Sequence, residues 1–278
     1  MGMRDAVLGL LTTRLWWSIV SVVAPALYAQ PYFVIVTASY NNQEWVDRNL
    51  RSIFEQTYTH WRLIYINDCS TDNTYDCAMR LIDEYGVRDK VQIINNSVRQ
   101  GHMANQYAAV HSCPDNVVIV NVDGDDSLID NQVLEYLSIV YEDPQVWMTY
   151  GQFWYWKKDR LGLCRPLPVE VVRMSTVRLH NPWRTSHLRT FYAGLYKKIK
   201  IEDLCYQGVW LPMCVDVATM MAMIEMAGEH CRSIDKILYL YNDGNTLCFY
   251  HDYEKRQREI EQYIRSCPVY ERLNSPPY

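Results

Sequence analysis

The most informative stretch of the sequence is residues 117–126, Val-Val-Ile-Val-Asn-Val-Asp-Gly-Asp-Asp. Its first four residues are apolar, as expected of a strand that is buried on both faces of a parallel sheet. Carboxylates follow at Asp123, Asp125 and Asp126, and Gly124 permits a tight turn between them. Carboxylates this close repel one another unless a cation neutralises them. Oxygen ligands suit Mg²⁺ or Mn²⁺, so the stretch predicts a strand that ends in a metal site.

Short apolar runs alternate with helical periodicity through the first half of the chain. The runs are residues 33–36, 63–66, 91–94 and 117–120. This alternation predicts an α/β fold with a central, mainly parallel sheet and helices on both faces. Ligands of such sheets bind outside the carboxyl ends of the strands. The acidic turn lies at such an end, which favours a metal site over the alternative, a solvated acidic turn or helix cap.

The second half of the chain is less regular. Residues 147–156 are rich in aromatics and predict a strand pair, whereas residues 157–190 are basic and loop-like. Residues 216–227 predict a buried helix that ends at Gly228. A late strand is expected at 237–241, and a polar, peripheral helix at 251–266.

Composition excludes several classes of protein. Of the 278 residues, 49% are hydrophobic and 21% are charged, which excludes a disordered or coiled-coil chain. The net charge of −5 argues against a nucleic-acid partner, because such proteins are usually basic. The nine cysteines show no CxxC spacing, which disfavours a zinc ribbon or a thioredoxin-like site and leaves disulfides open.

Residues 1–30 resemble a targeting segment. Arg4 and Arg14 precede an apolar run at 15–29, which is typical of a signal peptide or a short signal anchor. The alternative is an amphipathic helix that packs on the domain. We expect that this segment associates with a membrane and that the protein is membrane-associated or in the secretory pathway. A cytoplasmic location is the alternative, favoured by the glycosylation sequon at Asn95, whose glycan would interfere with the predicted ligand site.

The ends of the first two strands indicate a nucleotide site without a glycine-rich loop. Asp68 follows the second strand, where a carboxylate can accept hydrogen bonds from a nucleobase or a ribose. The alternative is a turn or capping residue. Residues 37–42 contain no glycine, and no GxxxxGK[ST] occurs anywhere. This disfavours NAD enzymes and P-loop NTPases.

Several ordered motifs resemble the start of the family 2 glycosyltransferases, which have the GT-A fold. They are residues 33–42, 52–58, 66–74, 95–105 and 120–126. The resemblance implies a nucleotide-sugar donor, most often UDP-linked, and Mn²⁺ or Mg²⁺ as cofactor. It also implies donor-binding positions, at Thr37, Ser39, Tyr40, Asp68, Arg99 and Asp123. Asp125 would be the main metal ligand, together with Asp123.

Inverting members of this family use a carboxylate at the start of a helix to deprotonate the acceptor. The best positional match is Asp216, although Val215 stands where the family usually has Glu. The alternative for Asp216 is a carboxylate that only stabilises the helix N-terminus. Glu202-Asp203 is the second candidate for the base. The segment 183–190 resembles the family's mobile loop. In this segment, Arg184 or Arg189 is a candidate contact to the diphosphate, and His187 is a candidate metal ligand. His251, which lies further along the chain, is another candidate metal ligand.

We therefore expect a GT-A domain at residues 31–250. Its nucleotide-sugar half would be 31–150 and its acceptor half 151–250, followed by a C-terminal helix and tail at 251–278. The expected function is metal-dependent, inverting transfer of a sugar to a glycan, lipid or protein hydroxyl. The alternatives are a nucleotidyltransferase, which would release pyrophosphate, and a catalytically degenerate binding module.

Overall fold

The computed structural model describes residues 30–245 and 253–278. The predicted targeting segment, up to residue 29, and His251 lie outside the described residues. Among the described helices, none combines the length and the apolar character that a membrane span requires.

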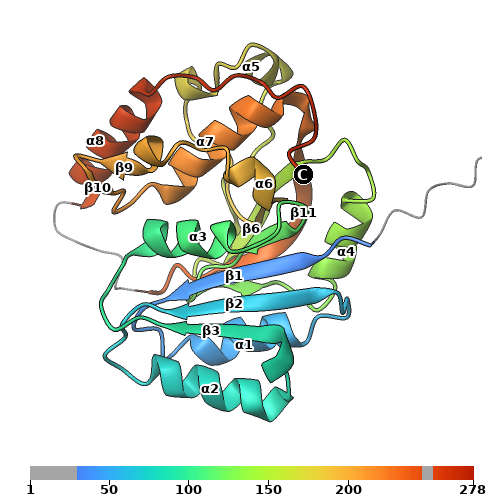
Figure 1. Cartoon of the computed structure of the whole chain (residues 1–278), viewed down its shortest axis with the longest axis vertical. Helices are drawn as coiled ribbons and strands as arrows, with labels where there is room; N and C mark the ends of the chain where they lie inside the picture. Colours follow the sequence, from blue (N-terminus) through green and yellow to red (C-terminus); the bar gives the residue numbers. More distant parts are fainter. Residues whose placement is uncertain (1–29, 246–252) are drawn as a thin grey trace, which may run out of the picture.

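The predicted first strands form one half of a curled sheet (Figure 1). Their order is β3-β2-β1-β4, and all of these pairings are parallel. The strands are β1 (Phe33–Ser39), β2 (Trp61–Asn67), β3 (Val91–Asn95) and β4 (Val118–Asn121). The connecting helices are α1 (Val46–Phe54), α2 (Thr74–Tyr85) and α3 (His102–His111). The carboxyl ends of the strands therefore meet at one edge, as the sequence predicts.

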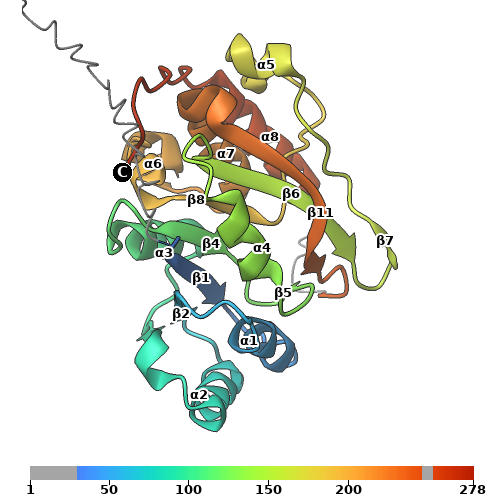
Figure 2. The same ribbon diagram turned by 90° about the vertical axis from the view of Figure 1, so that its right-hand side faces the viewer.

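The other half of the sheet is mixed. Strand β8 (Arg189–Tyr192) pairs antiparallel with both β4 and β6 (Met148–Tyr155). Beyond β6 lies β11 (Cys231–Tyr241), which is parallel to β6 and antiparallel to β5 (Ser127–Leu128). Figure 2 shows this continuation from β1 through β4, β8 and β6 to β11. The sheet is thus mixed but largely parallel.

Helices cover both faces of the sheet because β1 is apolar on both sides. Val34 and Val36 pack in a cluster with residues of α3 and of α7 (Val215–Ala227). Phe33 and Ile35 pack in a second cluster with α1, α2 and α4 (Val133–Val140). All four side chains are buried. In Figure 1, α1 and α2 accordingly lie on one side of the sheet, and α3 and α7 lie on the other.

Two expectations for the second half need correction. Residues 148–155 form the single strand β6 rather than a strand pair, and β11 begins at Cys231 rather than near 237. The remaining elements are α4 (Val133–Val140), β7 (Arg160–Leu161), α5 (Val169–Arg173), α6 (Ala193–Tyr196), β9 (Cys205–Tyr206) and β10 (Val209–Trp210). Short 3₁₀ turns lie at Arg88–Lys90, Val177–Leu179, Ile201–Leu204 and Gly228–His230.

The late helices complete the core. Helix α7 (Val215–Ala227) is almost wholly buried and ends at Gly228, close to the predicted bounds. Helix α8 (Tyr253–Ser266) is polar, but it buries Ile260 and Ile264 against the same cluster. It is therefore less peripheral than its composition predicts.

Candidate functional site

The acidic turn is held in place by α1. Asn49 is fully buried, and its side-chain amide donates hydrogen bonds to the backbone carbonyls of Asp123 and Asp126, at 3.0 and 2.9 Å. Arg48 donates to the carbonyl of Asp125 at 3.1 Å. A Cβ on Gly124 would lie 2.7 Å from the carbonyl oxygen of Ala38, so only glycine lets the turn pack on the end of β1. The turn is thus fixed before any ligand binds.

Asp126 is the innermost carboxyl group of the turn. Tyr239 of β11 donates to its Oδ2 at 2.8 Å, and the backbone N–H of Asn242 donates to its Oδ1 at 2.6 Å. Burial raises its pKa well above the usual value, and the neighbouring Asp125 and Asp123 raise it further. Both oxygens of Asp126 are therefore engaged inside the protein.

Asp123 lies between the interior and the surface. Its Oδ2 accepts a hydrogen bond from Arg189 Nη2 at 3.2 Å, and its Oδ1 lies 3.8 Å from His102 Nε2. Burial opposes ionisation, but the charge of Arg189 holds the pKa of Asp123 below its ordinary value. Asp123 is therefore an ionised carboxylate with one face toward solvent.

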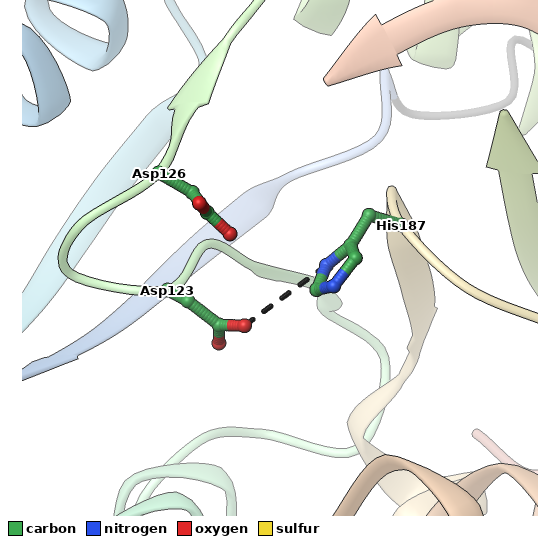
Figure 3. Close-up of side chains that lie close together, drawn as sticks. All are labelled: Asp123, Asp126 and His187. Carbon is green, nitrogen blue, oxygen red and sulfur yellow. Dashed lines mark ion pairs between the residues drawn. The ribbon is translucent and has the colours of Figure 1, made fainter. Parts of the chain in front are cut away.

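His187 lies opposite Asp123 and Asp126 (Figure 3). Its ring stacks on Tyr239 with centroids 4.5 Å apart, and its Nδ1 lies 4.0 Å from Asp123 Oδ2. Arg189 Nη2 is 3.1 Å from the same Nδ1 and can only donate, so Nδ1 accepts and the proton of the neutral ring sits on Nε2. Burial, followed by the charge of Arg189, lowers the pKa of His187 to about 3. His187 is thus neutral near pH 7.

Asp125 contacts the segment that follows β11. Its Oδ2 accepts a hydrogen bond from Asn245 at 2.7 Å. Burial raises its pKa, and the Asp123 charge adds to that shift. Beside it, the Arg48 guanidinium lies 4.3 Å from the ring centroid of Trp156 and 5.3 Å from that of Trp45. The rings of Trp45 and Trp156 thus hold the Arg48 guanidinium, which contacts this end of the turn.

Asp68 anchors the neighbouring loop at the end of β3. It is 3% exposed, and it accepts hydrogen bonds from the backbone N–H groups of Gln100 and Gly101 and from the Asn96 side chain, at 2.8–2.9 Å. Burial opposes ionisation, yet these donors lower the pKa of Asp68. The loop leads directly into α3, whose first residue, His102, faces Asp123. The two aspartates therefore belong to one continuous edge.

The other predicted donor positions lie along this edge. Thr37 and Ser39 are buried at the end of β1, and Ser39 accepts a hydrogen bond from Asn42. Arg99 stacks on the ring of Tyr40, with its guanidinium carbon 3.8 Å from the ring centroid. The structure thus brings the predicted nucleotide residues to the ends of β1, β2 and β3.

Asp216 lies in the first turn of α7, as predicted, and its side chain is 33% exposed. Its Oδ2 is 4.0 Å from Arg189 Nη1, so Asp216 and Asp123 face one guanidinium. Asp203, from the second candidate pair, instead accepts a hydrogen bond from Tyr270 in the C-terminal tail. Arg184 makes no ion pair among the described residues, and its Nε is buried without a partner there.

Several site residues were missed by the sequence analysis. They are Arg48, Asn49, His102, Tyr239, Asn242 and Asn245. Asn49 was detectable in principle, since it is an amide between the apolar positions Val46 and Leu50 on the inner face of α1. The others act across long sequence separations and leave no local signal.

The described residues offer one Asp-Asp-His group that could hold a divalent metal. Its members are Asp123, Asp126 and His187, whose ligand atoms lie within 4.8 Å of one another. Beyond the effect of burial, the charges of Asp125 and Asp123 raise the pKa of Asp126, and a divalent cation would offset this repulsion. The donor set therefore fits a hard or borderline cation such as Mg²⁺ or Mn²⁺.

Known structures share this architecture. Staphylococcus aureus TarS, crystallised with UDP-GlcNAc, aligns with a TM-score of 0.59 at 14% identity, over 82% of this chain and 65% of that one. The mannosyltransferase PcManGT of Pyrobaculum calidifontis, in complex with GDP-Man and Mn²⁺, also gives 0.59, at 17% identity over 90% and 67%. These likenesses confirm the predicted GT-A fold.

Sequence comparisons identify the family. The β-1,3-glucosyltransferase WfgD of Escherichia coli, which acts on a GlcNAc-diphosphoundecaprenol, is 24% identical over 119 residues, covering 43% of this chain and 44% of WfgD. The chain covers between 21% and 44% of the lengths of the curated relatives that it matches. The family model described as glycosyl transferase family 2 matches residues 34–204, which is more than half of the chain. The chain therefore belongs to glycosyl transferase family 2.

Proposed function

We propose that this chain transfers a sugar from a nucleoside-diphosphate sugar to an acceptor hydroxyl, with inversion. One observation carries the proposal. Two carboxylates lie next to the same Arg189 guanidinium. Asp123, from the turn after β4, is next to Nη2, and Asp216, from the start of α7, is next to Nη1. A donor-binding carboxylate and a candidate base are thus within reach of one reaction centre.

The donor would bind along the ends of β1, β2 and β3. Thr37, Ser39 and Tyr40 would line the base pocket, Arg99 would lie near the nucleotide, and Asp68 would contact the base from the loop that it anchors. TarS has been crystallised with UDP-GlcNAc and PcManGT with GDP-Man, which supports a UDP- or GDP-linked donor.

Asp123 and Asp125 would hold a divalent cation, Mn²⁺ or Mg²⁺. This pair is favoured over Asp126 and His187 because Asp123 and Asp125 are partly exposed, whereas Asp126 and His187 are buried. When bound, the cation neutralises the charge that develops on the departing nucleoside diphosphate. Asp126, His187 and Tyr239 form the buried side of the turn.

Asp216 would act as the general base. Its carboxylate is partly exposed and can accept the proton of an acceptor hydroxyl within hydrogen-bond distance. The acceptor oxygen then forms a bond to the anomeric carbon while the bond from that carbon to the diphosphate oxygen breaks. Attack from the face opposite the leaving group inverts the anomeric centre. The acceptor would be a glycan, a lipid or a protein.

The proposal is tested by incubating the full chain with a panel of UDP- and GDP-sugars, with Mn²⁺, with Mg²⁺ or with a chelator. We expect metal-dependent release of nucleoside diphosphate from one donor class. Release of pyrophosphate from a nucleoside triphosphate and a sugar phosphate would instead identify a nucleotidyltransferase. Metal-dependent nucleotide binding without turnover on any acceptor would identify a binding module.

Membrane association through residues 1–30 remains a separate prediction. It is tested by sedimenting the chain with phospholipid vesicles, with and without these residues. We expect only the longer chain to sediment, and equal sedimentation of both chains would contradict the prediction.

A further inference from the structure

Arg189 is a buried cation that faces carboxylates from both halves of the site. Its side chain is 7% exposed, its Nη2 lies 3.2 Å from Asp123 Oδ2, and its Nη1 lies 4.0 Å from Asp216 Oδ2. These aspartates come from the turn after β4 and from the first turn of α7. A single planar group therefore spans the gap between them.

The guanidinium is itself held in place by its surroundings. Arg189 is the first residue of β8 and pairs with Asn121 of β4, directly before the acidic turn. Its Nη2 also donates to His187 Nδ1, and the His187 ring stacks on Tyr239. Backbone pairing and side-chain packing thus fix both ends of the Arg189 side chain.

A second buried arginine, Arg178, forms a purely structural ion pair and differs from Arg189 in its contacts. Arg178 is 5% exposed and forms a two-pronged pair with Glu225, while its remaining Nη1 donates to the carbonyl of Ile264. Arg189 makes no such two-pronged pair, and its Nε is buried without a partner among the described residues. A buried donor without a partner is unfavourable, so stability alone does not account for this arrangement.

We propose that Arg189 is a positioning residue that fixes the base Asp216 relative to the donor carboxylate Asp123. This inference rests on the proposed function and adds a role that the motifs do not assign. In it, Arg189 does not pair with the diphosphate, the contact that the sequence suggests for Arg184 or Arg189. Its two Nη groups are engaged by Asp123 and Asp216 instead.

Replacement by lysine separates charge from geometry. A lysine ammonium is a single point charge, whereas the arginine fork can face two carboxylates at once. In Arg189→Lys we expect the ammonium to stay with Asp123, which is nearer, and to release Asp216. The donor end then keeps its counter-charge while the base loses its fixed position. A misplaced catalytic group lowers turnover without weakening ground-state binding.

The experiment compares Arg189→Lys with the matched control Arg178→Lys in the full chain. The donor is the UDP- or GDP-sugar that the wild type turns over, and its hydrolysis gives kcat and KM. Calorimetry with Mn²⁺ and the corresponding UDP or GDP gives the affinity, and thermal unfolding gives the stability. For Arg189→Lys we expect kcat to fall at least about tenfold, with KM and nucleotide affinity changed by less than about threefold. Arg178→Lys should keep the wild-type kcat.

Three outcomes would overturn the inference. They are an unchanged kcat in Arg189→Lys, a parallel loss of nucleotide affinity and kcat, or a kcat loss that only follows the fraction of unfolded protein. If the lysine variant does not fold, Arg189→Gln replaces it and only the fall in kcat is expected again, because glutamine also cannot face both carboxylates but removes the counter-charge of Asp123. An unchanged kcat in Arg189→Gln would then overturn the inference. Failure of the proposed function looks different, since the wild type itself would then turn over no donor.

Discussion

The two sides of the proposed site, the donor side and the acceptor side, are built differently. On the donor side, α1 and β11 fix the acidic turn through Asn49, Arg48 and Tyr239. On the acceptor side, Asp216 is one-third exposed, and the only ion pair of its carboxylate among the described residues is the 4.0 Å contact with Arg189. The difference indicates that the donor end is organised in advance, while the candidate base is left accessible to an acceptor.

The largest expected effect comes from removing charge on the donor side. Asp125→Asn keeps an acceptor for the Asn245 amide but cannot neutralise a cation. We expect a loss of donor turnover of about 10²–10³-fold, the scale of losing one group that stabilises developing charge. The measurement is nucleoside diphosphate release with Mn²⁺. The control Asp130→Asn, at an exposed position nearby, should keep wild-type turnover. Wild-type turnover in Asp125→Asn would refute the metal role.

The next effect is on the acceptor side. Asp216→Asn removes the proton acceptor, and we expect turnover to fall by about 10²-fold. Because the donor side does not depend on Asp216, the affinity for UDP with Mn²⁺ should change by less than about 1 kcal/mol. Calorimetry and turnover assays on the same preparation check this split. Equal losses of binding and turnover would show that the two sides are not independent.

The structure also predicts a pH-dependent contribution from Asp68. Its folded pKa lies below the unfolded value of about 3.9, so ionised Asp68 stabilises the fold above that pH and the contribution is lost as the pH falls below it. Asp68→Asn should lower the free energy of unfolding by about 2 kcal/mol at pH 7, because Asn presents one acceptor to three donors. Urea titrations at pH 7 and pH 3 should show this difference shrinking at the lower pH. A constant difference would contradict the assigned ionisation.

The smallest effect is expected at Tyr239. Tyr239→Phe keeps the ring that stacks on His187 but removes the hydroxyl that joins the Asp123 backbone N–H to the Asp126 carboxylate. We expect the free energy of unfolding to fall by about 1 kcal/mol, with a modest loss of turnover. Chemical denaturation measures the first quantity. A turnover loss as large as that of Asp125→Asn would mean that the hydroxyl has a direct role in the reaction.

The sequence predicted the parallel half of the sheet well because each strand and helix there carries its own periodic signal. Residues 33–36, 63–66 and 117–120 are locally apolar, and the polar segments after them must gather at one edge of a parallel sheet. Asp68, Asp123 and Asp216 were located by the same reasoning and by family resemblance. Their chemical roles remain predictions.

The mixed half was not predictable in the same way. Strand β8 is only four residues long, and its position between β4 and β6 depends on long-range pairing rather than on periodicity. The hydrogen bond from Tyr239 to Asp126 spans 113 residues, and the pair of Arg189 with Asp123 spans 66. Contacts of this kind follow from the tertiary fold, so the link between Asp123 and Asp216 emerged only from the structure.

The central claim is that the acidic turn holds a cation against the diphosphate of the donor. The most direct test is a calorimetric titration of the full chain with UDP, and in parallel with GDP, in Mn²⁺ and in EDTA. The account predicts binding of one of the two nucleotides that requires Mn²⁺ and that Asp125→Asn abolishes. Equal affinity in Mn²⁺ and EDTA, or unchanged metal-dependent binding in Asp125→Asn, would contradict it.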